Sequence, residues 1–274
     1  MSALLLGLGA GFGWGISDFL GGLASRRGPL IAVLTVSQLA GLVLMFAILA
    51  TATPALPSAP ALGWAVLAGL AGGIGVFALY RGMAIGSISI IAPISALAVV
   101  VPVAVGLARG ERPEDLEMVG IVLAIIGSVL AGKVPGKAST SGVGIAILAA
   151  LGFGWGFVFI DLAAEDGAIW AFTTARAAAS VAILATALMV LGIPRLAREV
   201  AVIAGAAGSI EASAGLAFAL ATTVGLLSVV SVLSSLYPAV TVGLAFIVLG
   251  ERLGRTQWLA VSLVLVGVAA IAAG

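Results

Sequence analysis

Long apolar stretches, interrupted by short polar segments, occupy almost the whole chain. Breaking them wherever charged residues, proline or paired glycines accumulate leaves ten segments of roughly 17 to 25 residues, the length that a helix needs to cross a bilayer. Five segments fall in each half, near 3–23, 30–50, 62–82, 87–107, 116–132, 143–163, 169–191, 200–222, 226–248 and 256–273. The pattern predicts an all-α integral membrane protein with ten transmembrane helices.

Two repeated motifs indicate an internal duplication. Gly-Phe-Gly-Trp-Gly occurs at 11–15 and again at 152–156, and the Gly-Glu-Arg at 110–112 recurs at 250–252. We therefore expect one five-helix repeat over residues 1–134, a linker over 135–142 and a second five-helix repeat over 143–274. Repeats with an odd number of helices insert with opposite orientations, and such inverted repeats are the architecture of many secondary transporters.

Composition narrows the class of protein further. Of the 274 residues, 62% are hydrophobic and only 8% are charged, and the mean hydropathy is +1.32, which makes lipid the expected surroundings for most of the chain. The chain has no His and no Cys, so haem, iron–sulfur and common zinc sites are not expected, and neither is any other cofactor or metal. A net charge of +1 gives no basic surface for nucleic acid. The expected partners are a small-molecule solute, the lipid bilayer and protons.

The distribution of basic residues predicts the orientation, because cytoplasmic loops retain Lys and Arg. Threading ten spans places nine of the 12 basic residues on one side, two on the other and Arg176 inside a span. The nine are Arg26, Arg27, Arg81, Lys133, Lys137, Arg195, Arg198, Arg252 and Arg255, and the two are Arg109 and Arg112. Both termini are expected outside the cytoplasm, in a plasma membrane such as a bacterial inner membrane. The apolar N-terminal run has no basic leader and is expected to be retained as the first span. Monomer and homodimer both remain open.

Glu211 is the most unusual residue of the predicted spans. It lies near the middle of the eighth segment, between Ser209 and Ser213, where a carboxylate costs about 3 kcal/mol on insertion scales. Burial favours the neutral form of an acid, so Glu211 is a candidate proton-coupling or cation-binding site. The alternative is a structural role, as a hydrogen-bonded acid or one half of an ion pair.

Two further acids have basic residues at comparable predicted depth. Asp18, in the first span, is at the level of Arg81, and Asp161, in the sixth span, is at the level of Arg176. Asp18 is a second candidate for proton coupling. We expect these pairs to act as a cytoplasmic gate and an external gate, with static salt bridges as the equal alternative.

Prolines interrupt the fourth span and its counterpart, at Pro93, Pro102 and Pro238. Interrupted helices near the midplane favour binding sites in inverted-repeat transporters, although such breaks also serve ordinary kinking. The uncharged polar groups near the breaks, and the tryptophans of the two pentapeptides, are the candidates for a substrate cavity. They are Tyr80, Ser95, Ser235, Tyr237, Trp14 and Trp155.

The half-chain pattern of an early Gly-Phe-Gly-Trp-Gly, a proline-containing fourth span and a following Gly-Glu-Arg resembles the EamA-type permeases of the drug/metabolite transporter superfamily. The resemblance covers both halves. It implies two inverted five-helix repeats, a central cavity lined by the first four helices of each half, and transport of a small organic solute, often as export. The superfamily's small multidrug resistance proteins carry a membrane-embedded glutamate that aligns near Trp14 here, with Asp18 one turn later. Glu211 has an apolar counterpart in the first half, so the repeat does not explain it.

The expected function is therefore secondary transport of a metabolite, amino acid or drug-like compound, as an exporter, by alternating access with coupling to protons. An uncoupled facilitator of the same solutes is one alternative. A membrane-embedded enzyme acting on a lipid-like substrate is another, but it needs clustered acids, and Asp18, Asp161 and Glu211 are predicted at different depths. We do not expect an enzyme.

Overall fold

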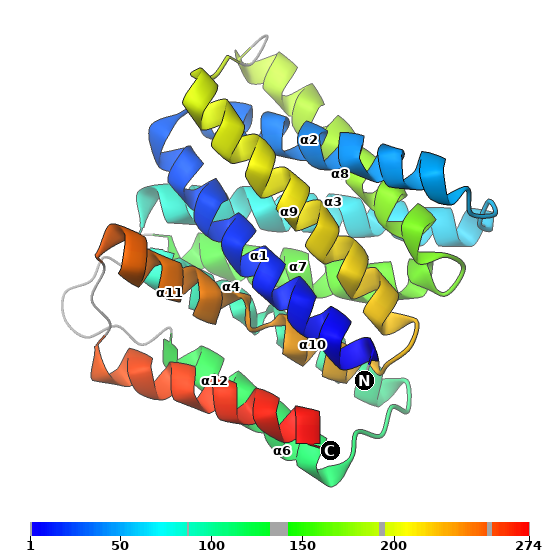
Figure 1. Cartoon of the computed structure of the whole chain (residues 1–274), viewed down its shortest axis with the longest axis vertical. Helices are drawn as coiled ribbons and strands as arrows, with labels where there is room; N and C mark the ends of the chain where they lie inside the picture. Colours follow the sequence, from blue (N-terminus) through cyan, green and yellow to red (C-terminus); the bar gives the residue numbers. More distant parts are fainter. Residues whose placement is uncertain (1, 87, 132–141, 192–194, 251–253, 274) are drawn as a thin grey trace.

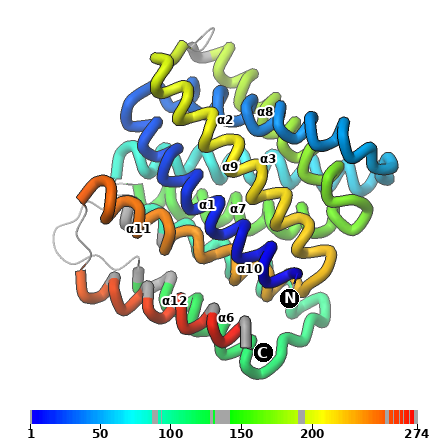
Figure 2. The backbone as a smooth tube through the Cα atoms, in the orientation of Figure 1, coloured from blue at the N-terminus to red at the C-terminus, as the bar shows by residue number. Residues whose placement is uncertain are grey.

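A computed structural model describes residues 2–86, 88–131, 142–191, 195–250 and 254–273. Throughout this part of the chain the regular elements are helices, without a strand (Figures 1 and 2). The predicted linker, 135–142, falls outside the described residues except for Gly142, and so do Glu251 and Arg252 of the second Gly-Glu-Arg.

The helices fall within four residues of the ten predicted segments. Their bounds are α1 Ser2–Arg27, α2 Leu30–Ala52, α3 Ala59–Ile85, α4 Ile88–Ser95, the 3-10 helix η1 Ala96–Val99, α5 Val100–Ala108, α6 Asp115–Ala131, α7 Val143–Ala164, α8 Ala168–Leu191, α9 Arg198–Thr222, α10 Leu227–Ser234, α11 Tyr237–Leu249 and α12 Arg255–Ala273.

Among the described residues, seven helical stretches are long and apolar enough to cross a membrane. They are Ser2–Ser25, Leu30–Ala52, Ala59–Ile85, Val143–Ala164, Ala168–Met189, Arg198–Thr222 and Leu227–Leu249. Large apolar side chains such as Met189 and Ile247 are more than 70% exposed, which suits a surface in contact with lipid rather than water. The chain is thus a multi-pass membrane protein.

The fourth and ninth segments are interrupted near their prolines. Residues 96–99 form a 3-10 turn that separates α4 from α5, with Pro93 before it and Pro102 after it. In the second half, α10 ends at Ser234 and α11 restarts at Tyr237, with Pro238 in its first turn. Proline has no backbone N–H to donate, so it fits at a helix start where that donor would have no intrahelical partner.

Helices from the two halves alternate across the bundle. The largest contacts between halves join α1 to α9, α3 to α7 and α6 to α12. The duplication makes α1 the counterpart of α7 and α3 the counterpart of α9, so the first two contacts are counterparts of each other. In Figure 1, α6 and α12 lie together at one edge of the bundle, and α2 and α8 lie at the opposite edge.

Glycines allow α1 and α7 to approach their neighbours closely, but the two copies contact different partners. A Cβ atom on Gly11 would lie 2.8 Å from the carbonyl oxygen of Ser234 in α10, whereas one on Gly152 would lie 2.7 Å from the backbone nitrogen of Gly75 in α3. The repeated pentapeptides therefore present different faces to the interior, which matters for the tryptophan that each contains.

Candidate functional site

A cavity lies inside the bundle between helices of both halves. Its volume is about 110 Å³, several times the ~10–15 Å³ that one water molecule needs. Its lining is mostly small and aromatic, with four strongly polar side chains. The lining residues are Trp14, Asp18, Gln38, Ala68, Gly69, Gly72, Gly73, Val76, Phe153, Gly156, Phe157, Ile160, Phe172, Ala175, Arg176, Ala179, Glu211, Gly215, Phe218 and Tyr237.

Three aromatic rings from three helices form one part of this lining. Trp14 of α1 stacks on Phe157 of α7 with 5.3 Å between ring centroids, and it lies 5.5 Å from Phe218 of α9. Phe157 and Phe218 are 4.8 Å apart, so the three rings contact one another. Such a cluster offers an apolar or π-rich surface to a ligand.

Trp155, the repeat counterpart of Trp14, does not reach the cavity. Its side chain is 46% exposed and stacks on Phe159, which in turn stacks on Trp64. The expectation that Trp155 lines the cavity is therefore wrong. The reason is the different rotation of the two pentapeptides, since Gly152 and Gly156 of α7 pack on α3 and Trp155 therefore points outward.

A buried ion pair stands at the polar side of the cavity. Arg176 of α8 is paired with Glu211 of α9, and its side chain is only 2% exposed. Its Nη1 also donates a hydrogen bond to Oε1 of Gln38 in α2, at 2.6 Å. These contacts join α8, α9 and α2 around the guanidinium of Arg176. The interior of a membrane protein tolerates such a buried charge only when it is paired and hydrogen-bonded.

Asp18 lies in the same cavity but has no such partner. It is 7% exposed, and within the described residues it forms no hydrogen bond and no ion pair. Its expected partner, Arg81, is exposed near the end of α3 and is not paired with it. The prediction of a cytoplasmic gate made of Asp18 and Arg81 is therefore wrong. Asp18 and Glu211, expected at different depths, line one cavity.

Of the remaining polar candidates, only Tyr237 belongs to the lining of this cavity as the described residues form it. Tyr237 lines the cavity, and its hydroxyl is 2.9 Å from Oγ of Ser95, which itself donates to the carbonyl oxygen of Ala92. Ser235 donates to the carbonyl oxygen of Val232, and Tyr80 is fully buried. Ser95 therefore supports Tyr237, while Ser235 and Tyr80 are outside the lining.

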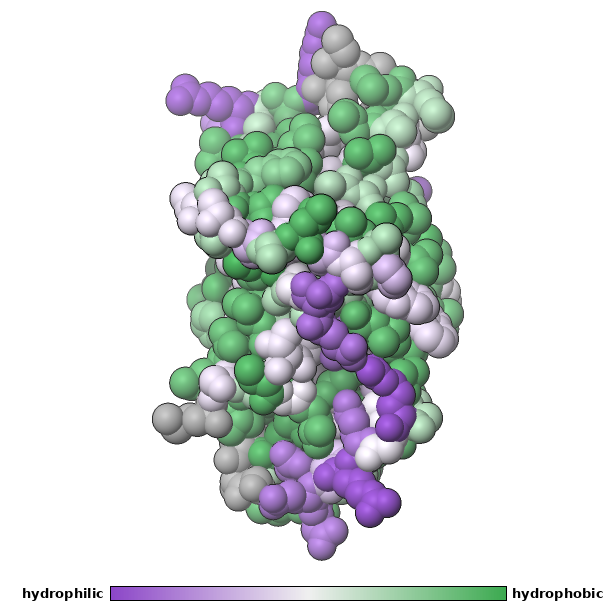
Figure 3. Space-filling view, turned by 90° about the vertical axis from the view of Figure 1, so that its right-hand side faces the viewer, coloured by the Kyte–Doolittle hydropathy of each residue, from purple (hydrophilic) through white to green (hydrophobic). Residues whose placement is uncertain are grey.

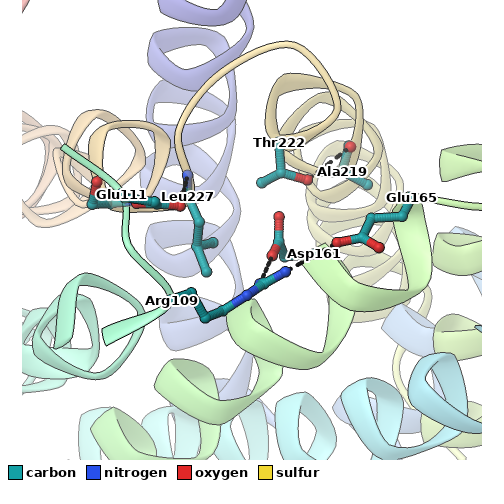
Figure 4. Close-up of polar contacts among 8 residues, drawn as sticks. Arg109, Glu111, Asp161, Glu165, Ala219, Thr222 and Leu227 are labelled. Carbon is teal, nitrogen blue, oxygen red and sulfur yellow. Dashed lines mark hydrogen bonds and ion pairs between the residues drawn. The ribbon is translucent and has the colours of Figure 1, made fainter. Parts of the chain in front are cut away.

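Asp161 forms an ion pair, but with a different arginine from the one expected. Nη1 of Arg109 contacts Oδ2 of Asp161 at 2.7 Å, and Nη2 contacts Oε1 of Glu165 at 3.0 Å (Figure 4). The hydrogen bond that Arg109 donates to the Asp161 carboxylate raises the pKa of Arg109 above its ordinary value, so the guanidinium stays charged. The expected Asp161–Arg176 pair is thus wrong, because Asp161 pairs with Arg109 and Arg176 pairs with Glu211. We call Arg109, Asp161 and Glu165 the arginine cluster.

Glu111 contacts the start of α10 close to the arginine cluster. Its two carboxylate oxygens accept hydrogen bonds from the backbone N–H groups of Leu227, at 2.9 Å, and Ser228, at 3.0 Å (Figure 4). These are donors without partners inside the helix, and the positive end of the helix dipole favours a carboxylate there. The acid of the first Gly-Glu-Arg motif therefore fixes the start of the interrupted ninth span.

Glu111→Gln is expected to lower the free energy of unfolding by about 1 kcal/mol, because it removes the charge that both N–H groups share. Thermal unfolding of the purified protein in detergent would measure this. Glu114→Gln, which changes an exposed acid of the same connection, is the control and should leave the unfolding temperature unchanged. Equal effects of the two variants would contradict a capping role.

The face of the bundle that carries these loops is partly hydrophilic. Figure 3 shows hydrophilic residues gathered in a band that runs from its centre downward, while apolar residues cover most of the rest. On this side Asp166 accepts a hydrogen bond from the backbone N–H of Ser58 at 2.5 Å. Hydrogen bonds from the side chain and the backbone of Ser58 hold the pKa of Asp166 below its ordinary value. This contact joins the loop before α3 to the loop before α8.

The sequence model of the EamA-like transporter family matches the chain twice, over residues 1–132 and 140–273. The chain belongs to the EamA-like transporter family. A solved structure, described only as "Crystal structure of protein", shares the fold, with a TM-score of 0.75 and 17% sequence identity over 98% of this chain and 96% of that one. No curated protein matches the sequence.

In this EamA-like protein, sequence reasoning missed three residues that complete the polar contacts. Gln38, which orients Arg176, is the only amide side chain of the segment 30–50, and that was its available signal. Arg109 and Glu111 belong to the repeated motif region, but the repeat alone does not say which groups they contact. Their partners come from α7 and α10, far away in sequence.

Proposed function

We propose that this protein is a secondary transporter that exports a small organic solute by alternating access, with coupling to protons. The observation that carries the proposal is the cavity between the two halves, which combines an aromatic wall with buried charged groups on α1, α8 and α9. Helix packing alone does not need charged side chains at this depth, where each one is costly. A pathway that binds a polar solute does need such side chains.

The transport fold in this proposal has ten spans in two inverted repeats. Its support is the pairing of counterpart contacts, α1 with α9 and α7 with α3, which an approximate two-fold axis in the membrane plane would produce. The excess of Lys and Arg on one side supports an orientation with both termini outside the cytoplasm, in a bacterial inner membrane. In that orientation the arginine cluster faces outward.

The arginine cluster is the proposed external gate in place of the Asp161–Arg176 pair. It connects the end of α5 to the end of α7, one helix region from each half. Separation of Arg109 from Asp161 would let these ends move apart and open the cavity outward. A cytoplasmic gate made of Asp18 and Arg81 has no such support.

Proton coupling is assigned to Glu211 and Asp18, the two acids of the cavity. The pairing of Glu211 with Arg176 favours one alternative, an uncoupled facilitator in which Glu211 only holds α8 against α9. Asp18, which has no hydrogen-bond or ion-pair partner among the described residues, favours coupling, because a buried acid without a counter-charge is stable when it holds a proton.

The test is solute and proton flux in liposomes that contain the purified protein, challenged with amino acids, organic amines, organic cations and sugars. Coupled transport predicts a solute-dependent proton flux that Asp18→Asn or Glu211→Gln removes, after correction for the amount of folded protein. Solute flux without proton flux would identify a facilitator. Absence of any flux across the whole panel would overturn the transporter proposal.

The repeated tryptophans provide a matched test of the cavity. Trp14→Ala is expected to reduce the rate of solute transport about tenfold or more, because it removes one ring of the three-ring cluster. Trp155→Ala changes the same pentapeptide in the other half and should alter transport less than twofold. Initial rates in liposomes measure both, and a larger effect of Trp155→Ala would place the solute elsewhere.

A further inference from the structure

The charged groups of the cavity do not balance. Three side chains of its lining carry charge, namely Asp18, Arg176 and Glu211. Arg176 and Glu211 neutralise each other as an ion pair. When Asp18 is ionised, the cavity therefore has one negative charge left over, on a carboxylate that is 7% exposed and has no hydrogen bond or ion pair among the described residues.

The neighbours of Asp18 do not supply the missing positive charge. The phenols of Tyr80 on α3 and Tyr237 on α11 lie close enough to interact electrostatically with it, and both are neutral groups. The basic residue Arg81 is exposed at the end of α3. A buried carboxylate in this setting needs a proton or a cation from solution.

The aromatic cluster lies beside this carboxylate. Trp14 precedes Asp18 by four residues on α1, so the two side chains share a face of the helix, and both line the cavity. Phe157 and Phe218 extend the surface of Trp14. An ammonium group that contacts Asp18 would find π faces within reach, and an apolar tail attached to it would be removed from water.

Arg176 provides a third point of contact. Its Nη1 donates to Gln38 and its Nη2 is paired with Glu211, but its buried Nε–H donates no hydrogen bond within the described part of the chain. Because the charge of Arg176 is already matched by Glu211, this donor suits a neutral acceptor such as a hydroxyl or carbonyl oxygen better than a second carboxylate.

We propose that the cavity binds a small amphipathic monocation. Its protonated amine contacts Asp18, its apolar or aromatic tail lies against Trp14, Phe157 and Phe218, and a neutral oxygen accepts from Nε of Arg176. This substrate class rests on the proposed transport function. The proposal also predicts that an amine without a carboxylate binds more tightly than the corresponding free amino acid. A free amino acid brings no net positive charge, and its carboxylate would compete with Glu211 for Arg176.

Phenylalanine and phenylalaninol are matched probes, because they differ only in a carboxylate against a neutral hydroxymethyl group. Phenethylamine lacks the oxygen altogether. Binding to the purified full-length protein in nanodiscs, measured by isothermal titration calorimetry at neutral pH, is expected to be at least about tenfold tighter for phenylalaninol than for phenylalanine. Phenethylamine should bind more tightly than phenylalanine and more weakly than phenylalaninol.

Asp18→Asn should abolish the preference for phenylalaninol over phenylalanine, and Asp18→Glu, which keeps the charge, should retain it. Size-exclusion profiles and thermal unfolding establish that both variants are folded. Tighter binding of phenylalanine by the wild type would overturn the inference in favour of a zwitterionic solute. A preference that survives Asp18→Asn would overturn the role of Asp18.

Two outcomes separate this inference from the proposed function. If none of the three probes binds while liposomes move a solute of another class, the monocation inference fails and the transporter proposal stands. If phenylalaninol binds as expected but is never moved across the membrane, together with no flux of any other solute, the cation site stands and the transporter proposal fails.

Discussion

Glu211→Gln is expected to destabilise the protein more than Arg176→Gln, although both variants break the same ion pair. Loss of one partner of a buried pair costs about 3–5 kcal/mol when the other charge stays behind. After Arg176→Gln, the remaining acid can become neutral by taking up a proton. After Glu211→Gln, Arg176 cannot lose its charge, because a guanidinium is not deprotonated in proteins.

Unfolding in mixed micelles, followed by circular dichroism, would measure this order. The double variant Arg176→Gln/Glu211→Gln buries no charge of the pair and is expected to recover most of the stability that Glu211→Gln loses. A Glu211→Gln protein as stable as the wild type would mean that Asp18 takes over as the counter-ion of Arg176. Adding Asp18→Asn to that variant would then lower its stability. Greater damage from Arg176→Gln would contradict the argument.

Gly208→Ala is the second change with a large expected effect. A Cβ atom at this position on α9 would overlap the backbone carbonyl oxygen of Ser37 on α2. A backbone atom cannot avoid the overlap by a change of side-chain rotamer. The two helices must move apart, and we expect a loss of about 3 kcal/mol. Because Ser37 precedes Gln38, the movement also disturbs the hydrogen bond to Arg176, so transport should fall as well.

Gly205→Ala is a close control on the same helix. A new Cβ at this position would lie 3.9 Å from the Cβ atom of Ala40, which is an ordinary van der Waals contact. Alanine is intrinsically favoured over glycine within a helix, so this variant should be as stable as the wild type or slightly more so. Thermal unfolding in detergent distinguishes the two, and equal stability of both variants would show that α2 and α9 are not held this closely.

The helices could be predicted because hydrophobicity and length alone determine where a chain crosses a membrane. Segments such as 143–163 and 200–222 therefore match α7 and α9 almost to the residue. Breaks in the fourth and ninth segments followed from the chemistry of proline. The contacts between helices could be predicted from the sequence only in part, because in lipid the apolar face of a helix does not mark its protein-facing side.

The candidate site shows where sequence reasoning ended. Glu211 stood out by its depth, yet its partner depends on the rotation of α8 relative to α9, and comparable depth wrongly suggested Asp161 for Arg176. Trp14 and Trp155 occupy identical pentapeptides, and only the packing of their glycines distinguishes the one in the cavity from the one on the outside. Rotation about the helix axis is the information that an almost uniformly apolar sequence does not carry.

The arginine cluster makes the two ends of the duplicated bundle chemically unequal. Applying the repeat offsets, Asp161 corresponds to Leu20 and Arg109 to Leu249, and both leucines pack against one apolar core cluster. An ion pair is weakened by dissolved salt and by acid strong enough to protonate Asp161, whereas leucine side chains have no charge that salt can screen and no group that takes up a proton. In the proposed transporter, the salt and pH of the medium at the Arg109 end would therefore act on this ion pair, and they would not act in the same way on the apolar contacts of Leu20 and Leu249.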